Sequence, residues 1–218
     1  YKPSKFQSFE IWGFGGTTLT NFITLGCNYS YAPVVGYDFF EPREDDRHFR
    51  TPRGGHFGAW VSSDYRKKIA MDVSGRYFAG GMYGIHGYGW NISPRIRFND
   101  RVLLIYSFRK DANPTQVGYA STIEFEEELP NEVIFGKRNR NTYTNTLELQ
   151  YLFSSKMAIN LRARHYWSKV MYNTFHLLDE EGYLANTNFN DDLDVNYNAF
   201  TLNLAYTWQF APGSEMSL

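Results

Sequence analysis

The segment FTLNLAYTWQF, residues 200–210, alternates between apolar and polar or small side chains along its whole length. Phe200, Leu202, Leu204, Tyr206, Trp208 and Phe210 form the apolar set. Because successive side chains of a β-strand point to opposite faces, this period of two predicts a strand with one apolar and one polar face. The run is longer than the ~5–6 residues of an average globular strand. It fits a tilted membrane strand of ~9–11 residues.

The same period recurs in five other segments of the chain. They are residues 22–31, 69–77, 88–98, 143–153 and 157–167. Together with weaker segments they predict about ten strands. The segment 101–132 is open to two interpretations, one long strand followed by a loop or a strand with an extra short hairpin. The apolar phase that runs from Val133 to Phe153 favours one long strand there.

Short and long connections alternate between these strands. The short ones lie near 15–20, 63–67, 98–101, 153–156 and 211–214, the long ones at 33–55 and 171–196, and the medium ones near 79–83 and 121–132. Short turns at one end and long loops at the other are typical of outer-membrane barrels. The predicted fold class is therefore all-β, an antiparallel up-and-down transmembrane β-barrel of which about ten strands are visible.

Composition excludes several classes of protein. Aromatic residues make up 18% of the 218 residues, and disordered chains contain few of them. The net charge of −1 argues against a nucleic-acid partner, which usually demands a basic excess. A single cysteine, Cys27, excludes an internal disulfide framework. The mean hydropathy of −0.48 does not exclude a barrel, in which only alternate residues need be apolar.

The polar face carries an expected network of arginines and acids. A soluble lipocalin-like barrel would also alternate, but with its apolar residues inside and mixed Lys and Glu outside. Here the polar face carries Asn, Thr, Ser, Gly and Arg, and the planar guanidinium suits crowded pairing with carboxylates. The predicted lumen network consists of Asp72, Arg76, Arg95, Arg97, Glu148, Arg162 and Arg164.

The apolar face carries rings near the ends of its strands. Such amphipathic rings form the girdles of membrane barrels at the level of the lipid headgroups. The predicted aromatic girdle consists of Tyr31, Trp60, Trp90, Phe98, Phe153, Trp167, Trp208 and Phe210.

Catalytic, metal and cofactor sites are not predicted. Carboxylates and histidines gather in loop 41–56 and carboxylates in residues 179–194, but their spacing matches no defined calcium loop, and they are interpreted as solvated loops. His48 beside Asp46 suggests a surface protease only weakly, because nothing fixes hydrogen-bond reach. His165 is expected to be interfacial, and Cys27 to face lipid or a neighbouring strand.

Three motifs carry a family resemblance. YTWQFAPGSE at 206–215 is the most distinctive, and RARHYWS at 162–168 and SSDYRKK at 62–68 support it. They resemble the barrel of outer-membrane proteins from Bacteroidota-type bacteria that carry an N-terminal domain similar to carbohydrate-binding family 9. The resemblance implies that residues 1–218 are the C-terminal part of the barrel, with upstream strands and the N-terminal domain outside this sequence. The family's final strand normally continues beyond the point where Leu218 stands here.

These features predict a protein of the bacterial outer membrane that is not an enzyme. The leading hypothesis is a membrane anchor or scaffold that serves glycan handling or a larger surface complex. A passive or gated channel for small solutes is the alternative, and a surface hydrolase a weaker one. Its expected partners are the lipid bilayer and lipopolysaccharide, the remaining strands of the same barrel and other outer-membrane proteins, with no nucleic acid.

Overall fold

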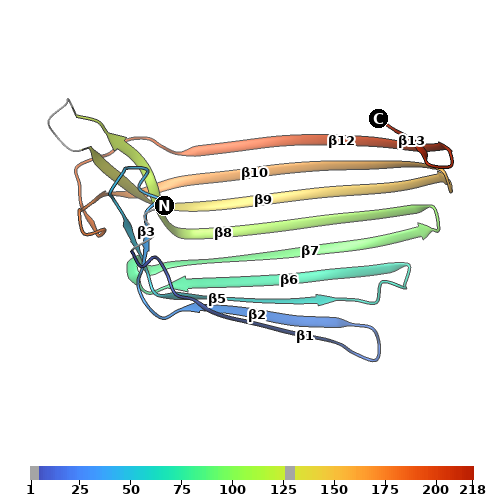
Figure 1. Ribbon diagram of the computed structural model, residues 1–218, viewed down its shortest axis with the longest axis horizontal. Helices are drawn as coiled ribbons and strands as arrows, with labels where there is room; N and C mark the ends of the chain where they lie inside the picture. The colour runs from blue at the N-terminus through green and yellow to red at the C-terminus, as the bar shows by residue number, and fades with distance from the viewer. Residues whose placement is uncertain (1–4, 126–130) are drawn as a thin grey trace.

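The computed structural model describes residues 5–125 and 131–218, and most of them belong to one antiparallel sheet. Ten strands follow one another in the order β1-β2-β5-β6-β7-β8-β9-β10-β12-β13, and a short strand β11 pairs with β10 off this path (Figure 1). Their bounds are β1 Ile11–Thr18, β2 Thr24–Ala32, β5 Gly54–Ser62, β6 Ile69–Gly80, β7 Ile85–Asn99, β8 Val102–Ile123, β9 Glu132–Ser154, β10 Met157–Leu178, β11 Leu184–Asn186, β12 Val195–Ala211 and β13 Ser214–Ser217. The predicted all-β antiparallel up-and-down arrangement is confirmed, whereas the described strands do not close into a barrel.

The connections alternate between the two ends of the sheet. The turns between β1 and β2, β5 and β6, β7 and β8, β9 and β10, and β12 and β13 lie at one end, and the other connections lie at the opposite end (Figure 1). The predicted separation by length does not hold between β6 and β7, because their connection, residues 81–84, is shorter than residues 63–68 between β5 and β6. Within the described part of the chain, β1 pairs only with β2, and β13 only with β12, so the sheet has two free edges. The predicted loop 121–132 includes residues 126–130, which lie outside the described residues.

Strands β8, β9 and β10 are longer than the alternation indicated. They contain 22, 23 and 22 residues, so segment 101–132 holds one long strand and β10 continues into the loop predicted at 171–196. Register shifts at Asn113/Gln116, Tyr119/Ser121 and Tyr172/Thr174 mark these extensions. Backbone pairing persists there without a simple apolar alternation, since bulges reverse which residues share a face.

The predicted loop 33–55 also contains regular structure. Residues Gly36–Asp38 (β3) pair with Phe49–Thr51 (β4) in a separate two-stranded sheet, and a 3-10 turn, η1, covers Met82–Gly84. No helix in the described ranges is long and apolar enough to cross a membrane.

Cross-strand register defines two chemically distinct faces of the main sheet. One ladder runs Ile96, Leu104, Leu149, Leu161 and Leu204 across five neighbouring strands, and we call this side the apolar face. The next ladder runs Arg95, Ile105, Glu148, Arg162 and Asn203, and we call this side the polar face.

The buried core lies at the loop end and not beneath the apolar face. Phe49, Val133, Phe135 and Leu178 form it, with Tyr83, Val117, Tyr119 and Leu184 packed around. The connection between β2 and β5 reaches this core from the opposite part of the sheet, because Phe49 lies 4.7 Å from Phe135 between ring centroids. Arg50 fastens it further through a 2.8 Å hydrogen bond to the Glu181 carbonyl. We call this packed unit the loop cap.

Candidate functional site

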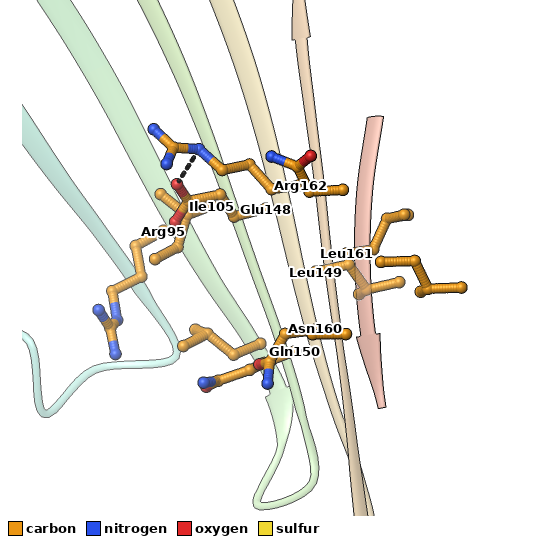
Figure 2. Close-up of a pocket in the computed structure, with 12 residues that line it drawn as sticks. Arg95, Ile105, Glu148, Leu149, Gln150, Asn160, Leu161 and Arg162 are labelled. Carbon is orange, nitrogen blue, oxygen red and sulfur yellow. Dashed lines mark ion pairs between the residues drawn. The ribbon is translucent and has the colours of Figure 1, made fainter. Parts of the chain in front are cut away.

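An ion pair occupies the middle of the polar face. Arg162 Nε lies 3.2 Å from Glu148 Oε1, and the two residues stand opposite each other on β10 and β9. They line a shallow depression of about 570 Å³ together with Arg95, Gln150 and Asn160. Figure 2 shows these polar groups on one side of the strands and the side chains of Leu149 and Leu161 on the other. The alternation in sequence is therefore a true separation of faces.

Asp72 does not pair with an arginine. The Tyr65 hydroxyl, in the turn between β5 and β6, donates a hydrogen bond to Asp72 Oδ2, while Asp72 Oδ1 is buried and has no hydrogen-bond partner among the described residues. Burial, and then this bond, raise the pKa of Tyr65. The Arg95 guanidinium lies 5.4 Å from the Tyr65 ring centroid, so Tyr65 links two residues of the predicted network.

Arg76 pairs with an acid outside the predicted network. Its Nη2 lies 2.5 Å from Asp111 Oδ1, and Arg109 Nε lies 2.7 Å from Asp111 Oδ2. Asp111 and Arg109 were missed because segment 101–132 was ambiguous. Extending the period of two along β8, which places Ser107, Arg109 and Asp111 on one face, would have found them.

Two further arginines of the predicted network, Arg97 and Arg164, form no ion pair with a described acid. Among the described residues, no carboxylate lies within 4.0 Å of Arg97 or Arg164. Arg164 instead lies 5.5 Å from the Tyr166 ring centroid. The predicted set is therefore not one network: the structure joins Arg162 to Glu148, and Asp72 to Arg95 through Tyr65.

The rings on the apolar face form two rows. The row farther from the turns, called here the loop-end row, is a continuous chain of Trp90, Phe108, Tyr143 and Trp167 across β7 to β10, with successive centroid distances of 5.1, 6.5 and 5.3 Å. It crosses β9 and β10 near the middle of these long strands. Tyr31 lies on the same face on β2. Near the turn end lie Phe98, Phe153, Trp208 and Phe210, with Trp208 and Phe210 5.8 Å apart.

Trp60 is an exception and corrects the predicted girdle. Register places it opposite Gly26 and Ser74, which belong to the polar face. Its indole lies directly over Gly26, where a Cβ atom would collide with the ring. In the glycine-rich strand β5 the alternation of apolar and polar residues is weak, so the sequence pattern predicted the wrong face for Trp60.

Carboxylates of the two acidic loops accept hydrogen bonds from backbone amides of the same protein. Glu41 Oε1 accepts from the Tyr119 amide at 2.9 Å, and Asp179 Oδ1 accepts from the Tyr183 amide at 2.7 Å. Within residues 5–125 and 131–218, no three His, Cys, Asp or Glu side chains gather closely enough to hold a metal ion. His48 Nε2 lies 3.1 Å from the Glu181 carbonyl, and His165 Nε2 lies 3.0 Å from Asn198 Oδ1 on the apolar face. Cys27 is exposed on that face.

The turn at residues 63–68 gives a pH prediction. Hydrogen bonds from the Arg66 side chain and backbone lower the pKa of Asp64 from 3.8 to about 2. A carboxyl with a depressed folded pKa stabilises the turn above its unfolded pKa, and that stability is lost as the pH falls from 3.8 to about 2. Carboxyl carbon NMR should show Asp64 titrating near pH 2, and Arg66→Ala should raise this midpoint towards 3.8, whereas Lys67→Ala should move it less. An Asp64 that titrates near 3.8 in the unmodified protein would contradict this geometry.

Comparison with known proteins shows the family to which the chain belongs. No curated protein matches the chain. The sequence profile described as a domain of unknown function, DUF5916, matches residues 1–218. Because the match covers the whole sequence, this chain belongs to the DUF5916 family.

Proposed function

We propose that the chain is part of an integral outer-membrane β-barrel that acts as a membrane anchor or scaffold and is not an enzyme. One observation carries the proposal: the apolar face has no second layer over it in the described structure. Leu202 and Leu204, in the middle of β12, are 59% and 62% exposed. Contiguous apolar surface of this kind on a folded protein marks a membrane or a protein contact.

The spacing of the two aromatic rows supports a membrane contact. On β10, Met157 pairs with Trp208 of the turn-end row, and Trp167 stands ten positions further along in the loop-end row. Ten residues at ~3.3 Å span ~33 Å along the strand, and a tilt of ~40° shortens this to ~25 Å, the usual height of the apolar band of a barrel. Between these rows, the ladders of Leu161 and Ala163 are mainly aliphatic, and the ladder of His165 carries Asn145, Phe108 and Phe200.

The free edges of β1 and β13 support closure by further strands. An open sheet edge is not tolerated in hydrocarbon, because its unpaired amides and carbonyls find no water. The resemblance to outer-membrane proteins with a carbohydrate-binding family 9-like domain favours strands of the same polypeptide. In that arrangement the polar face encloses the lumen, and the loop cap lies at the outer end.

Lipid partners follow from the same orientation. Lys110 stands on the apolar face in the loop-end aromatic row, with Nζ 5.5 Å from the Tyr143 centroid. A cation among rings at headgroup level suits the phosphates of lipopolysaccharide. As a scaffold, the protein would serve glycan handling or a larger surface complex.

Membrane fractionation tests the scaffold function. The full polypeptide, exported from the cytoplasm of a Gram-negative host, should sediment with the outer membrane. It should resist carbonate extraction and require detergent for release. A soluble periplasmic reference protein provides the control. Recovery of the folded polypeptide from the soluble fraction without detergent would contradict the proposal.

Arg97 and Arg164 favour a channel as the second candidate. Arginines without acids would make an open lumen prefer anions. If the reconstituted protein conducts, its reversal potential in a KCl gradient should indicate chloride selectivity. Arg97→Gln combined with Arg164→Gln should shift that potential towards zero, whereas Lys156→Gln in the turn after β9 should not. A cation-selective current would contradict this assignment. Absence of current would overturn the channel function and leave the scaffold function as the proposal.

A further inference from the structure

A second depression on the polar face lies away from the Glu148–Arg162 pair. Its volume is about 490 Å³, and its lining includes Asn28, Trp60, Arg76, Asn91 and Asp111. Two adjacent ladders build it, and the residues that line it lie on β2, β5, β6, β7 and β8. One contains Phe14, Asn28, Gly58, Arg76, Gly89 and Asp111, and the other contains Gly16, Gly26, Trp60, Ser74, Asn91 and Arg109.

Glycine keeps this part of the polar face hollow. A Cβ atom at Gly26 would collide with the indole of Trp60, and one at Gly89 would collide with the Asp111 carboxylate. Because neither position carries a side chain, the indole lies close to the backbone of β2 and the Arg76–Asp111 pair lies close to β7. The depression therefore has a flat aromatic wall beside fixed polar groups.

Further rings continue the aromatic surface towards the edge of the sheet. Trp12 and Phe14 on β1 belong to the polar face, opposite Ser30 and Asn28. Their rings are stacked, 6.1 Å apart with an interplanar angle of 10°. They are 68% and 76% exposed, on the same face as Arg76 and Asn91. Two strand spacings, ~10 Å, separate β1 from Trp60 on β5.

The polar groups beside these rings are open for bonding. The side chains of Asn28, His56, Ser74 and Asn91 make no hydrogen bond to another described residue. Asp111 is different, since both of its oxygens are held by Arg76 and Arg109 at 2.5 and 2.7 Å. The other N–H groups of these two arginines remain as donors fixed in place, beside the amides of Asn28 and Asn91 and the hydroxyl of Ser74.

We infer that this depression binds a saccharide chain. Apolar C–H faces of sugar rings suit the exposed indole and phenyl faces, and hydroxyls suit the amide, hydroxyl and guanidinium groups. A pocket that combines aromatic walls with a few convergent polar groups is the usual form of a small-ligand site. The inference deepens the scaffold function proposed above, and rests on it only in taking the polar face to remain open to water.

Calorimetric titration of the full polypeptide in detergent micelles tests the site. The probes are a neutral β-linked glucose hexasaccharide and an acidic galacturonate hexasaccharide, each raised to about 10 mM so that a Kd of ~1 mM is detected. We expect saturable binding. Tighter binding of the acidic probe would support the site with Arg76 and Arg109 as its recognition groups. Failure of both probes to bind would overturn the inference.

Matched variants locate the binding. Trp60→Ala should weaken it about tenfold. Asn91→Ala, which removes an amide and leaves the rings intact, should weaken it about fivefold and stands in if Trp60→Ala does not fold. Trp208→Ala, on the apolar face, should leave the affinity unchanged. Equal weakening by Trp208→Ala and Trp60→Ala would overturn the assignment.

The two proposals fail in different ways. Loss of saccharide binding by a protein that still fractionates with the outer membrane overturns the saccharide site alone. Retained binding by a protein found in the soluble fraction overturns the scaffold function alone.

Discussion

Replacing Leu161 with arginine should destabilise the lipid-inserted protein by about 2–4 kcal/mol, the cost of a charge near the midplane of a barrel's lipid face. Leu161 lies between Leu149 and Leu204 on the apolar face, near the middle of the band bounded by the two aromatic rows. No described side chain there offers the guanidinium a carboxylate. Urea-dependent unfolding from lipid vesicles, followed by tryptophan fluorescence, measures the loss.

The adjacent residue provides a matched control. Asn160 points to the opposite side of the same strand and lines the depression beside Gln150 (Figure 2). Asn160→Arg adds the same side chain one position away, on the face proposed to meet water, and should cost less than about 1 kcal/mol. If Leu161→Arg is tolerated as well as Asn160→Arg, the apolar face does not meet hydrocarbon.

Truncation of Phe135 to alanine should open the loop cap, with a loss of about 3–5 kcal/mol. Phe135 is fully buried, contacts Phe49 at 4.7 Å between ring centroids and belongs to the same cluster as Leu178. Removing its ring leaves a cavity between the β2–β5 connection and the ends of β9 and β10. Native-state trypsin cleavage at Arg43 and Arg53 should become faster, because cleavage follows the population of the opened loop.

Val34→Ala is the control for this effect. Val34 lies in the same connection but is 39% exposed, so its truncation should change the cleavage rate little. Unchanged protection in Phe135→Ala would show that polar contacts, such as that of Arg50 with the Glu181 carbonyl, are sufficient to hold the cap.

The main sheet was predictable from sequence because one physical signal dominates it. Apolar side chains alternate with polar or small ones along segments such as 69–77, 88–98 and 200–210. Turn chemistry reinforced the signal, since Pro212 and Gly213, with φ of 76° at the glycine, separate β12 from β13.

The loop end was less predictable, and long-range packing explains why. Residues 171–178 carry no clean alternation, yet they continue β10, because Leu178 packs into the loop cap with Phe49. That contact joins residues far apart in the sequence, and no local pattern encodes it. The β3–β4 hairpin is short and depends on the same packing.

The site was predicted in composition more than in pairing. The arginines and acids were predicted to share the polar face, but the acid that pairs with Arg76, Asp111, lies outside the predicted set. Pairing depends on register between β6, β7 and β8, and a sequence period gives the face of a residue without its neighbour across the sheet. Trp60 was assigned to the wrong face, because the glycines around it in the sequence do not show which alternate positions are apolar.

Spin-label scanning of residues 157–167 in lipid vesicles tests the central claim most directly. After Cys27→Ser, a nitroxide is placed at each position of β10 in turn, and its collisions with oxygen and with a water-soluble nickel chelate are compared. We predict oxygen maxima at Ile159, Leu161 and Ala163 and nickel maxima at Asn160, Arg162 and Arg164, in a strict period of two. Nickel maxima at Ile159, Leu161 and Ala163, or equal access at all positions, would contradict an apolar face that meets lipid.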